Sequence, residues 1–259
     1  MTVLPGAEPF HHEGGDVGVL LCHGFTGSPH ALRPWAEFLA ERGLTVSLPL
    51  LPGHGTRWED LRPTGWQDWY AAVERELLAL LDRCARVFVC GLSMGGALAL
   101  RLAARHGEAI SGVVVVNPAI AVHGATAKAL PLVRHLAPST RGLAGDIAKE
   151  GVTEVGYDRV PLHAAHSVRR FFRTVDGELP QVTQPLLVLH SPEDHVVPPA
   201  DSLRVLGRVS STDVAEILLE HSYHVATLDN DADRIFAESH AFIGRLASRA
   251  DDEGTTTGG

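Results

Sequence analysis

Short apolar runs alternate with longer segments of helical spacing, and this alternation limits the possible folds more than any other feature of the chain. The run at residues 111–119, "SGVVVVNPA", contains four consecutive valines, which is typical of a strand buried on both faces. Strands of this kind that are connected by helices form a parallel sheet with helices on both sides. The sequence therefore predicts an α/β fold with a mostly parallel central sheet.

Further apolar runs have the length of strands, and the segments between them have the spacing of helices. The expected strands lie at residues 17–24, 44–51, 86–91, 185–194 and 214–222. The expected helices lie at residues 28–43, 65–84, 95–107 and about 231–248. Ligands bind to such sheets at the carboxyl ends of the strands, so the residues that follow each strand are the first candidates for a site.

Residues 119–179 interrupt the alternation. This stretch has amphipathic helical patches and many turn residues, but no clear strand. We expect it to form an inserted helical cap over the sheet edge, while residues 1–118 and 180–250 make the core. Residues 251–259, "DDEGTTTGG", are polar and rich in glycine, so we expect a disordered tail there.

The composition is that of an ordinary globular protein. Hydrophobic residues make up 45% of the 259-residue chain and charged residues 20%, so a large core can form. The formal net charge is −9 and no block of lysines or arginines is present, which argues against nucleic acid and anionic membranes as partners. The sequence has no apolar run of about 18 residues that could serve as a membrane anchor, and its start lacks the pattern of an export signal. We therefore expect a cytoplasmic protein.

One serine stands in a turn where a nucleophile is expected. Residues 91–95 read Gly-Leu-Ser-Met-Gly, which matches G-x-S-x-G, and they follow a predicted strand and open a predicted helix. Glycines at 91 and 95 would allow the tight turn, because larger side chains would collide with neighbouring backbone. The alternative is a strand–helix turn softened by glycine for packing alone. The context of the motif favours Ser93 as a nucleophile.

A serine needs a base and an orienting acid, which follow it in this chain order in such folds. Asp194 lies just past the strand at 185–190 and is the best acid, and Glu193 is the second choice because its side chain is longer. His221 and His224 both follow the last strand, in "EHSYHVATLD", and sequence order alone does not separate them.

The histidine pairs spaced H-x-x-H raise the question of a metal site. His221 and His224 have this spacing, as do His163 and His166, but neither pair has a third ligand in a recognised pattern. No glycine-rich loop with the spacing of a nucleotide site is present either. We therefore expect neither a metal nor a cofactor.

Acyl transfer also requires hydrogen-bond donors for the oxyanion. The residue after the nucleophile supplies one backbone N–H, which here belongs to Met94. The loop after an early strand supplies the other, and in "HGFTG" (23–27) Phe25 is the natural candidate. A second glycine–histidine loop, "LPGHGT" (51–56), carries His54, which we interpret as a structural residue.

Taken together, these motifs resemble the α/β-hydrolase superfamily, and within it the bacterial monoacylglycerol lipase and small carboxylesterase family. The resemblance runs from about residue 6 to the last predicted helix near 248. The motifs that carry it are "HGFTG", "GHG", "GLSMGG", "EDHVVPP" and "SYHVATLD".

The resemblance implies a role for each matching position. Ser93 would be the nucleophile, Asp194 the orienting acid and His224, rather than His221, the base. Phe25 and Met94 would donate their backbone N–H groups to the oxyanion.

For the cap, the resemblance implies two substrate contacts. Glu154 would read the glycerol hydroxyls, and Leu143 would line the acyl channel. The implied activity is hydrolysis of carboxylic esters, monoacylglycerols above all. A broad carboxylesterase or thioesterase is the alternative. A ligand-binding protein on the same scaffold is more remote, because fold does not fix function but serine, acid and histidine all stand here in order.

Overall fold

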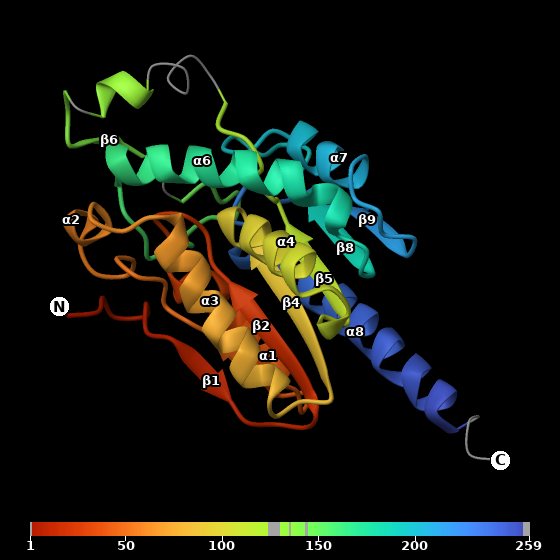
Figure 1. The fold of residues 1–259 in the computed structure, drawn as a ribbon. Helices are drawn as coiled ribbons and strands as arrows, with labels where there is room; N and C mark the ends of the chain where they lie inside the picture. The colour runs from red at the N-terminus through yellow and green to blue at the C-terminus, as the bar shows by residue number, and fades with distance from the viewer. Residues whose placement is uncertain (1, 124–129, 135, 143–144, 256–259) are drawn as a thin grey trace.

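A seven-stranded sheet runs through the molecule in the order β1-β3-β2-β4-β5-β8-β9 (Figure 1). The computed structural model describes residues 2–123, 130–134, 136–142 and 145–255. Every pair of neighbours in the sheet is parallel except β1 and β3. The strands are β1 (Phe10–His12), β2 (Val17–Cys22), β3 (Thr45–Leu48), β4 (Arg86–Leu92), β5 (Gly112–Val116), β8 (Leu186–His190) and β9 (Val214–Leu218).

The central strands are buried on both faces, which explains their continuous apolar sequences. Every residue of β5 and β8 is buried, and the valines of β5 pair in register with β4 on one side and with β8 on the other. The predicted mostly parallel sheet is confirmed. The edge strand β1 was not expected, because its sequence "FHH" carries no apolar run.

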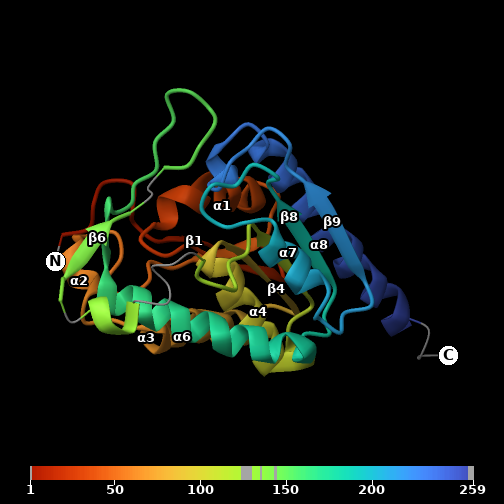
Figure 2. The ribbon, with the colours of Figure 1, turned by 90° about the horizontal axis from the view of Figure 1, so that it is seen from above.

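Helices cover both faces of the sheet (Figure 2). Helices α3 and α4 lie on one face, and α1 and α8 lie on the other. The helices of the core are α1 (Arg33–Ala40), α2 (Trp58–Leu61), α3 (Trp66–Leu81), α4 (Met94–His106), α7 (Ala200–Leu206) and α8 (Ala232–Thr255). The described residues also form short 3-10 turns, which are η1 (Pro29–Leu32), η2 (Gly107–Ala109), η3 (Leu179–Gln181) and η4 (Ala226–Leu228).

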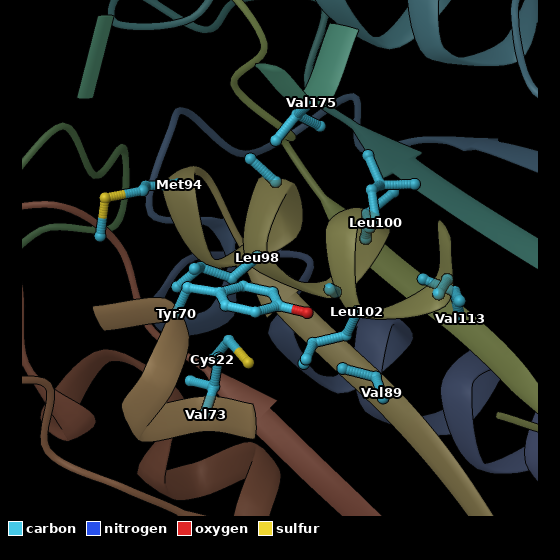
Figure 3. Packing of buried hydrophobic residues seen from close by; sticks show 14 of the residues in the cluster. Cys22, Tyr70, Val73, Val89, Met94, Leu98, Leu100, Leu102, Val113 and Val175 are labelled. Atoms are coloured by element: carbon cyan, nitrogen blue, oxygen red, sulfur yellow. The ribbon is translucent and has the colours of Figure 1, made fainter. Parts of the chain in front are cut away.

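The sheet separates two hydrophobic cores. On the α3 and α4 side, Tyr70 and Leu98 pack above the strands, as Figure 3 shows. On the other side, Trp35 stacks on Phe236 with ring centroids 6.4 Å apart. Full burial of a large side chain stabilises the fold by roughly 1.5–3 kcal/mol, so these two layers hold the strand ends, and the loops after them, in place.

The segment expected to form a helical cap also contains a small second sheet. Strands β6 (Ser139–Arg141) and β7 (Arg159–Pro161) pair antiparallel, so the expectation of an insertion without strands was wrong. These strands have three residues each, and their sequences "STR" and "RVP" are too short to show an alternating pattern.

Helix α6 (Leu162–Glu178) attaches this segment to the core. Phe171 of α6 stacks on Trp66, and Glu178 lies 2.6 Å from Arg101 of α4. In Figure 1 the helix crosses the molecule above α3 and α4.

The C-terminal helix is longer than expected. Helix α8 continues as far as Thr255, so residues 251–255 of the expected disordered tail are helical, and residues 256–259 lie outside the described residues. Within the described ranges, no helix combines the length and the apolar character that crossing a membrane requires.

Candidate active site

Ser93 occupies a strained turn between β4 and α4. Its backbone angles are φ 57° and ψ −120°, a region that residues with a side chain rarely adopt. The turn is tied to its surroundings, because Ser93 donates its N–H to Val116 (3.0 Å) and its carbonyl accepts the N–H of Ala119 (3.2 Å). A Cβ at Gly95 would overlap the carbonyl oxygen of Cys22 at the end of β2. The neighbouring backbone therefore leaves no room for a side chain there.

The side chains of Ser93, His224 and Asp194 form a continuous chain of hydrogen bonds. His224 Nε2 lies 3.0 Å from Ser93 Oγ, and His224 Nδ1 lies 2.7 Å from Asp194 Oδ2. The other carboxylate oxygen of Asp194 accepts the N–H groups of Val196 (2.8 Å) and Val197 (2.7 Å). The side chains of His224 and Asp194 are 9% and 1% exposed, so water does not compete for these bonds.

The two alternatives from the sequence lie elsewhere. His221 is exposed, and its backbone N–H is bound by Asp231. Glu193 is also exposed, although it neighbours Asp194 in sequence. The loop after β9 thus brings His224, which lies three positions after His221, to Ser93.

Asn117 is a polar contributor that the sequence places at a strand end without indicating its role. It follows β5 directly, is buried, and has a φ of 44°. Its Nδ2 donates to the carbonyls of His224 (2.8 Å) and Tyr223 (3.2 Å) and to Ser191 Oγ (3.2 Å), while its Oδ1 accepts the N–H of Ser191. This one side chain joins the ends of β5 and β8 to the histidine loop. The signal available was an amide placed at the carboxyl end of a fully apolar strand.

The loop after β2 lies against the serine. A Cβ on Gly24 would lie 3.4 Å from Ser93 Cβ, and the next residue is Phe25. Within the described part of the chain, the N–H groups of Phe25 and Met94 have no hydrogen-bond acceptor. Both residues line the same cavity as Ser93.

His23 holds this loop in position. Its Nδ1 donates to the carbonyl of Gly24 (2.9 Å), and its Nε2 accepts the N–H of Leu51 (3.1 Å). Complete burial lowers the pKa of His23 to about 4, so the ring is neutral at pH 7 and can serve both partners. His54 packs edge-on against His23 at 5.1 Å, and its pKa is also lowered by burial. His54 thus contacts the loop through packing.

A cavity of about 400 Å³ opens over the serine. Phe25, Ser93, Glu154 and His224 are among the residues that line it. Its apolar lining comes from both the core and the inserted segment, with Ala119, Val160, Val168, Phe172, Val196 and Val197. Such a cavity suits a ligand with an extended apolar part and one polar end.

Glu154 is the carboxylate of the inserted segment that the sequence resemblance assigns to substrate binding, and Asp158 lies nearby in the sequence. Its carboxylate reaches Gly27, where a Cβ would lie 2.7 Å from Glu154 Oε1. Burial raises the pKa of Glu154, while the nearby charge of His224 and a hydrogen bond from the Gly145 backbone act in the opposite direction. The structure therefore places Glu154 near the histidine. Leu143, the other cap candidate, lies outside the described residues.

In the ranges that the structure describes, no group of three or more histidine, cysteine, aspartate or glutamate side chains could hold a metal ion.

The fold is that of an α/β hydrolase, with a serine, a histidine and an aspartate meeting at the carboxyl ends of its strands. The chain belongs to the family described as serine aminopeptidase, S33, whose model matches residues 16–231. The family resemblance found in the sequence is thereby confirmed.

Two relatives illustrate the range of the family. The chain is 42% identical to a thermostable monoacylglycerol lipase of Bacillus sp. (strain H-257), over 95% of this chain and 97% of that protein. It is 26% identical to a carboxylesterase of Bacillus subtilis (strain 168), over 92% of this chain and 97% of that protein.

Solved structures agree with the fold. One reported for LipS and LipT, two metagenome-derived lipolytic enzymes, is 39% identical and superposes with a TM-score of 0.92, covering 94% of this chain and all of that chain. The monoacylglycerol lipase of Paleococcus ferrophilus, at 20% identity, has a TM-score of 0.75 over 93% of this chain and 99% of its own, and shares the fold. The chain is thus a serine hydrolase homologous to a monoacylglycerol lipase.

Proposed function

We propose that the protein hydrolyses carboxylic esters through an acyl-enzyme, with monoacylglycerols as its substrate class. The observation that carries the proposal is the hydrogen-bonded chain from Ser93 Oγ through His224 to Asp194, of which Ser93 and His224 line a largely apolar cavity. The relative that is 42% identical, a monoacylglycerol lipase, supports the choice of substrate.

The first stage of the reaction adds Ser93 Oγ to the ester carbonyl. His224 Nε2 accepts the proton of Ser93 Oγ while this oxygen attacks the ester carbonyl. Asp194 accepts a hydrogen bond from His224 Nδ1, which fixes the tautomer and stabilises the imidazolium that forms. The developing oxyanion binds to the N–H groups of Phe25 and Met94, which have no other acceptor within the described residues.

The second stage releases the products. The tetrahedral intermediate collapses, the ester bond breaks, and His224 gives its proton to the departing alcohol. Water then enters, gives a proton to the same imidazole and attacks the acyl-enzyme. The fatty acid leaves and Ser93 regains its proton, so this series of steps needs no cofactor.

The cavity supplies the two parts of substrate recognition. Its apolar wall, which includes Val168 and Phe172, receives the acyl chain. Glu154 is the residue we propose for the glycerol hydroxyls, because a carboxylate accepts hydrogen bonds from two neighbouring hydroxyls. Leu143 remains our proposal for the acyl channel on the grounds of the resemblance alone.

The central test replaces the serine and each histidine. Ser93→Ala is expected to abolish hydrolysis of a short p-nitrophenyl ester and leave the fold intact. His224→Ala is expected to be similarly inactive, and His221→Ala, the matched control, to retain most activity. Wild-type turnover by Ser93→Ala would refute the proposal, and the reverse order of the two histidine variants would reassign the base.

The substrate class requires a separate test. Turnover of a monoacylglycerol is compared with that of the methyl ester of the same acid, for the wild-type protein and Glu154→Gln. We expect the wild-type protein to prefer the monoacylglycerol and the variant to lose that preference, because the amide accepts fewer hydrogen bonds. Equal turnover of both esters by both proteins would indicate a broad carboxylesterase and remove the role of Glu154.

A further inference from the structure

The inserted segment is fastened to the two loops that carry His224 and Asp194. Residues 145–149 run beside these loops, and the backbone carbonyl of Asp146 accepts the N–H of Val225 (3.0 Å). The side chains that make the remaining contacts are Asp146 on the segment and Asp229 after the histidine.

The carboxylate of Asp146 bridges the two loops. Its Oδ2 accepts the backbone N–H of His224 (3.1 Å) and that of His195 (3.2 Å), the residue after Asp194. Its Oδ1 lies 2.9 Å from His195 Nδ1, and this hydrogen bond raises the pKa of His195. The ring of His195 in turn packs edge-on against Tyr223 at 4.5 Å.

Asp229 fixes the same segment from the other side. Its Oδ2 accepts the N–H groups of Ala148 (2.7 Å) and Tyr223 (2.9 Å), and its Oδ1 accepts that of Lys149 (2.9 Å). Asp229 is 1% exposed, so these bonds are shielded from water. The position of Asp146 is therefore set by backbone contacts that do not involve its own side chain.

We propose that Asp146 is a positioning residue for hydrolysis, which holds the backbone of His224 and the loop of Asp194 in register so that the imidazole reaches Ser93. The inference rests on the proposed function of these three residues. It adds that the inserted segment, through Asp146, helps to set the catalytic geometry in addition to covering the substrate.

Asp146 can affect the catalytic geometry because it binds the backbone of a catalytic residue directly. The N–H of His224 belongs to the residue whose imidazole must lie within hydrogen-bond reach of Ser93, and among the described residues Asp146 is its one acceptor. Loss of that acceptor leaves two N–H groups, those of His195 and His224, without a partner, and the loops would shift to find water. A misplacement of about 1 Å in a catalytic group can reduce the rate by about 100-fold.

Three substitutions separate position from charge. Asp146→Ala removes every acceptor, Asp146→Asn keeps an oxygen of the same reach without the charge, and Asp146→Glu keeps the charge but moves the oxygens by one methylene. Glu150→Gln, an exposed carboxylate four positions further along the same segment, is the matched control. For each variant, kcat and KM are measured with a p-nitrophenyl ester, the rate of labelling with a fluorophosphonate is recorded, and Tm is determined.

We expect Asp146→Ala to lower kcat by about 10- to 100-fold with little change in KM, and to slow labelling of Ser93 in parallel. Asp146→Asn should recover most of the wild-type kcat, whereas Asp146→Glu should remain impaired although it is charged. Glu150→Gln should match the wild-type protein.

Wild-type kcat in Asp146→Ala would overturn the inference, as would full activity of Asp146→Glu beside an impaired Asp146→Asn. The Asn and Glu pair decides the matter by itself if the Ala variant does not fold. Activity in Ser93→Ala would instead refute the proposed function, so the two failures are distinguishable.

Discussion

The backbone at Ser93 can be tested separately from its chemistry, by comparing Ser93→Ala with Ser93→Gly. Both variants lack the hydroxyl, and both are expected to be inactive. They differ in that alanine must adopt the φ of 57° and ψ of −120° that the turn imposes, whereas glycine adopts these angles without steric cost. The strain stored at the nucleophile therefore contributes to the difference in stability between the two variants.

The size of this difference follows from three opposing contributions. Relief of the strain at such a residue stabilises the glycine variant by about 2 kcal/mol. The greater freedom of glycine in the unfolded chain reduces this gain by about 0.7 kcal/mol. Loss of a half-buried methyl group reduces it by about 0.4 kcal/mol more. Strain is the largest of the three, so Ser93→Gly should be more stable than Ser93→Ala by about 1 kcal/mol.

Urea unfolding monitored by circular dichroism measures the difference in the free energy of unfolding. For a chain of this size, about 1 kcal/mol also corresponds to roughly 2–4 °C in Tm. A Ser93→Ala variant as stable as Ser93→Gly, or more stable, would show that the turn stores no such strain and would refute the reasoning.

Three further predictions concern the same site. Gly95→Ala should lower kcat by about 100-fold, because its methyl group displaces the end of β2. The control is Gly244→Ala, at an open position of α8, which should stabilise the fold by roughly 0.5–1 kcal/mol in a urea titration. Asp194→Asn should lower kcat by about 10⁴-fold with the fold retained, and a loss under tenfold would contradict its role. His23 has a native pKa of about 4 against 6.5 when unfolded, so the unfolded state binds more protons between these values and stability falls as the pH drops through them. His23 should contribute about 2 kcal/mol to the loss of stability between pH 7 and pH 5, and a His23→Gln variant with the same pH dependence would contradict this.

The sequence was most informative where burial dictated the pattern. The apolar runs of β4 and β8 read as strands because both of their faces are covered, and these runs placed Ser93 and Asp194 after strand ends. The small sheet of β6 and β7 could not be predicted in this way. Its strands are half-exposed or exposed over most of their length, so tertiary contacts rather than an apolar pattern determine their conformation.

The contacts that build the site were harder to predict than its residue types. His221 and His224 lie three positions apart in one loop, and their chain order carries no information about which ring faces Ser93. That depends on Asn117 and Asp146, which bind the backbone of the histidine loop from positions 107 and 78 residues away. No local pattern marks such long-range contacts of a side chain with a distant backbone.

The position of Asn117 also has a consequence for the order of folding. The serine turn forms within residues 86–117, where β4, α4 and β5 are consecutive in the chain, but His224 lies 131 residues beyond Ser93. The histidine loop can bind to Asn117 only after β8 and β9 have joined the sheet beside β5. Contacts of such long range are costly to close and are expected late in folding. On dilution from denaturant, the helical signal in circular dichroism should therefore return before the reactivity of Ser93 with a fluorophosphonate. That reactivity would then report the last step of assembly.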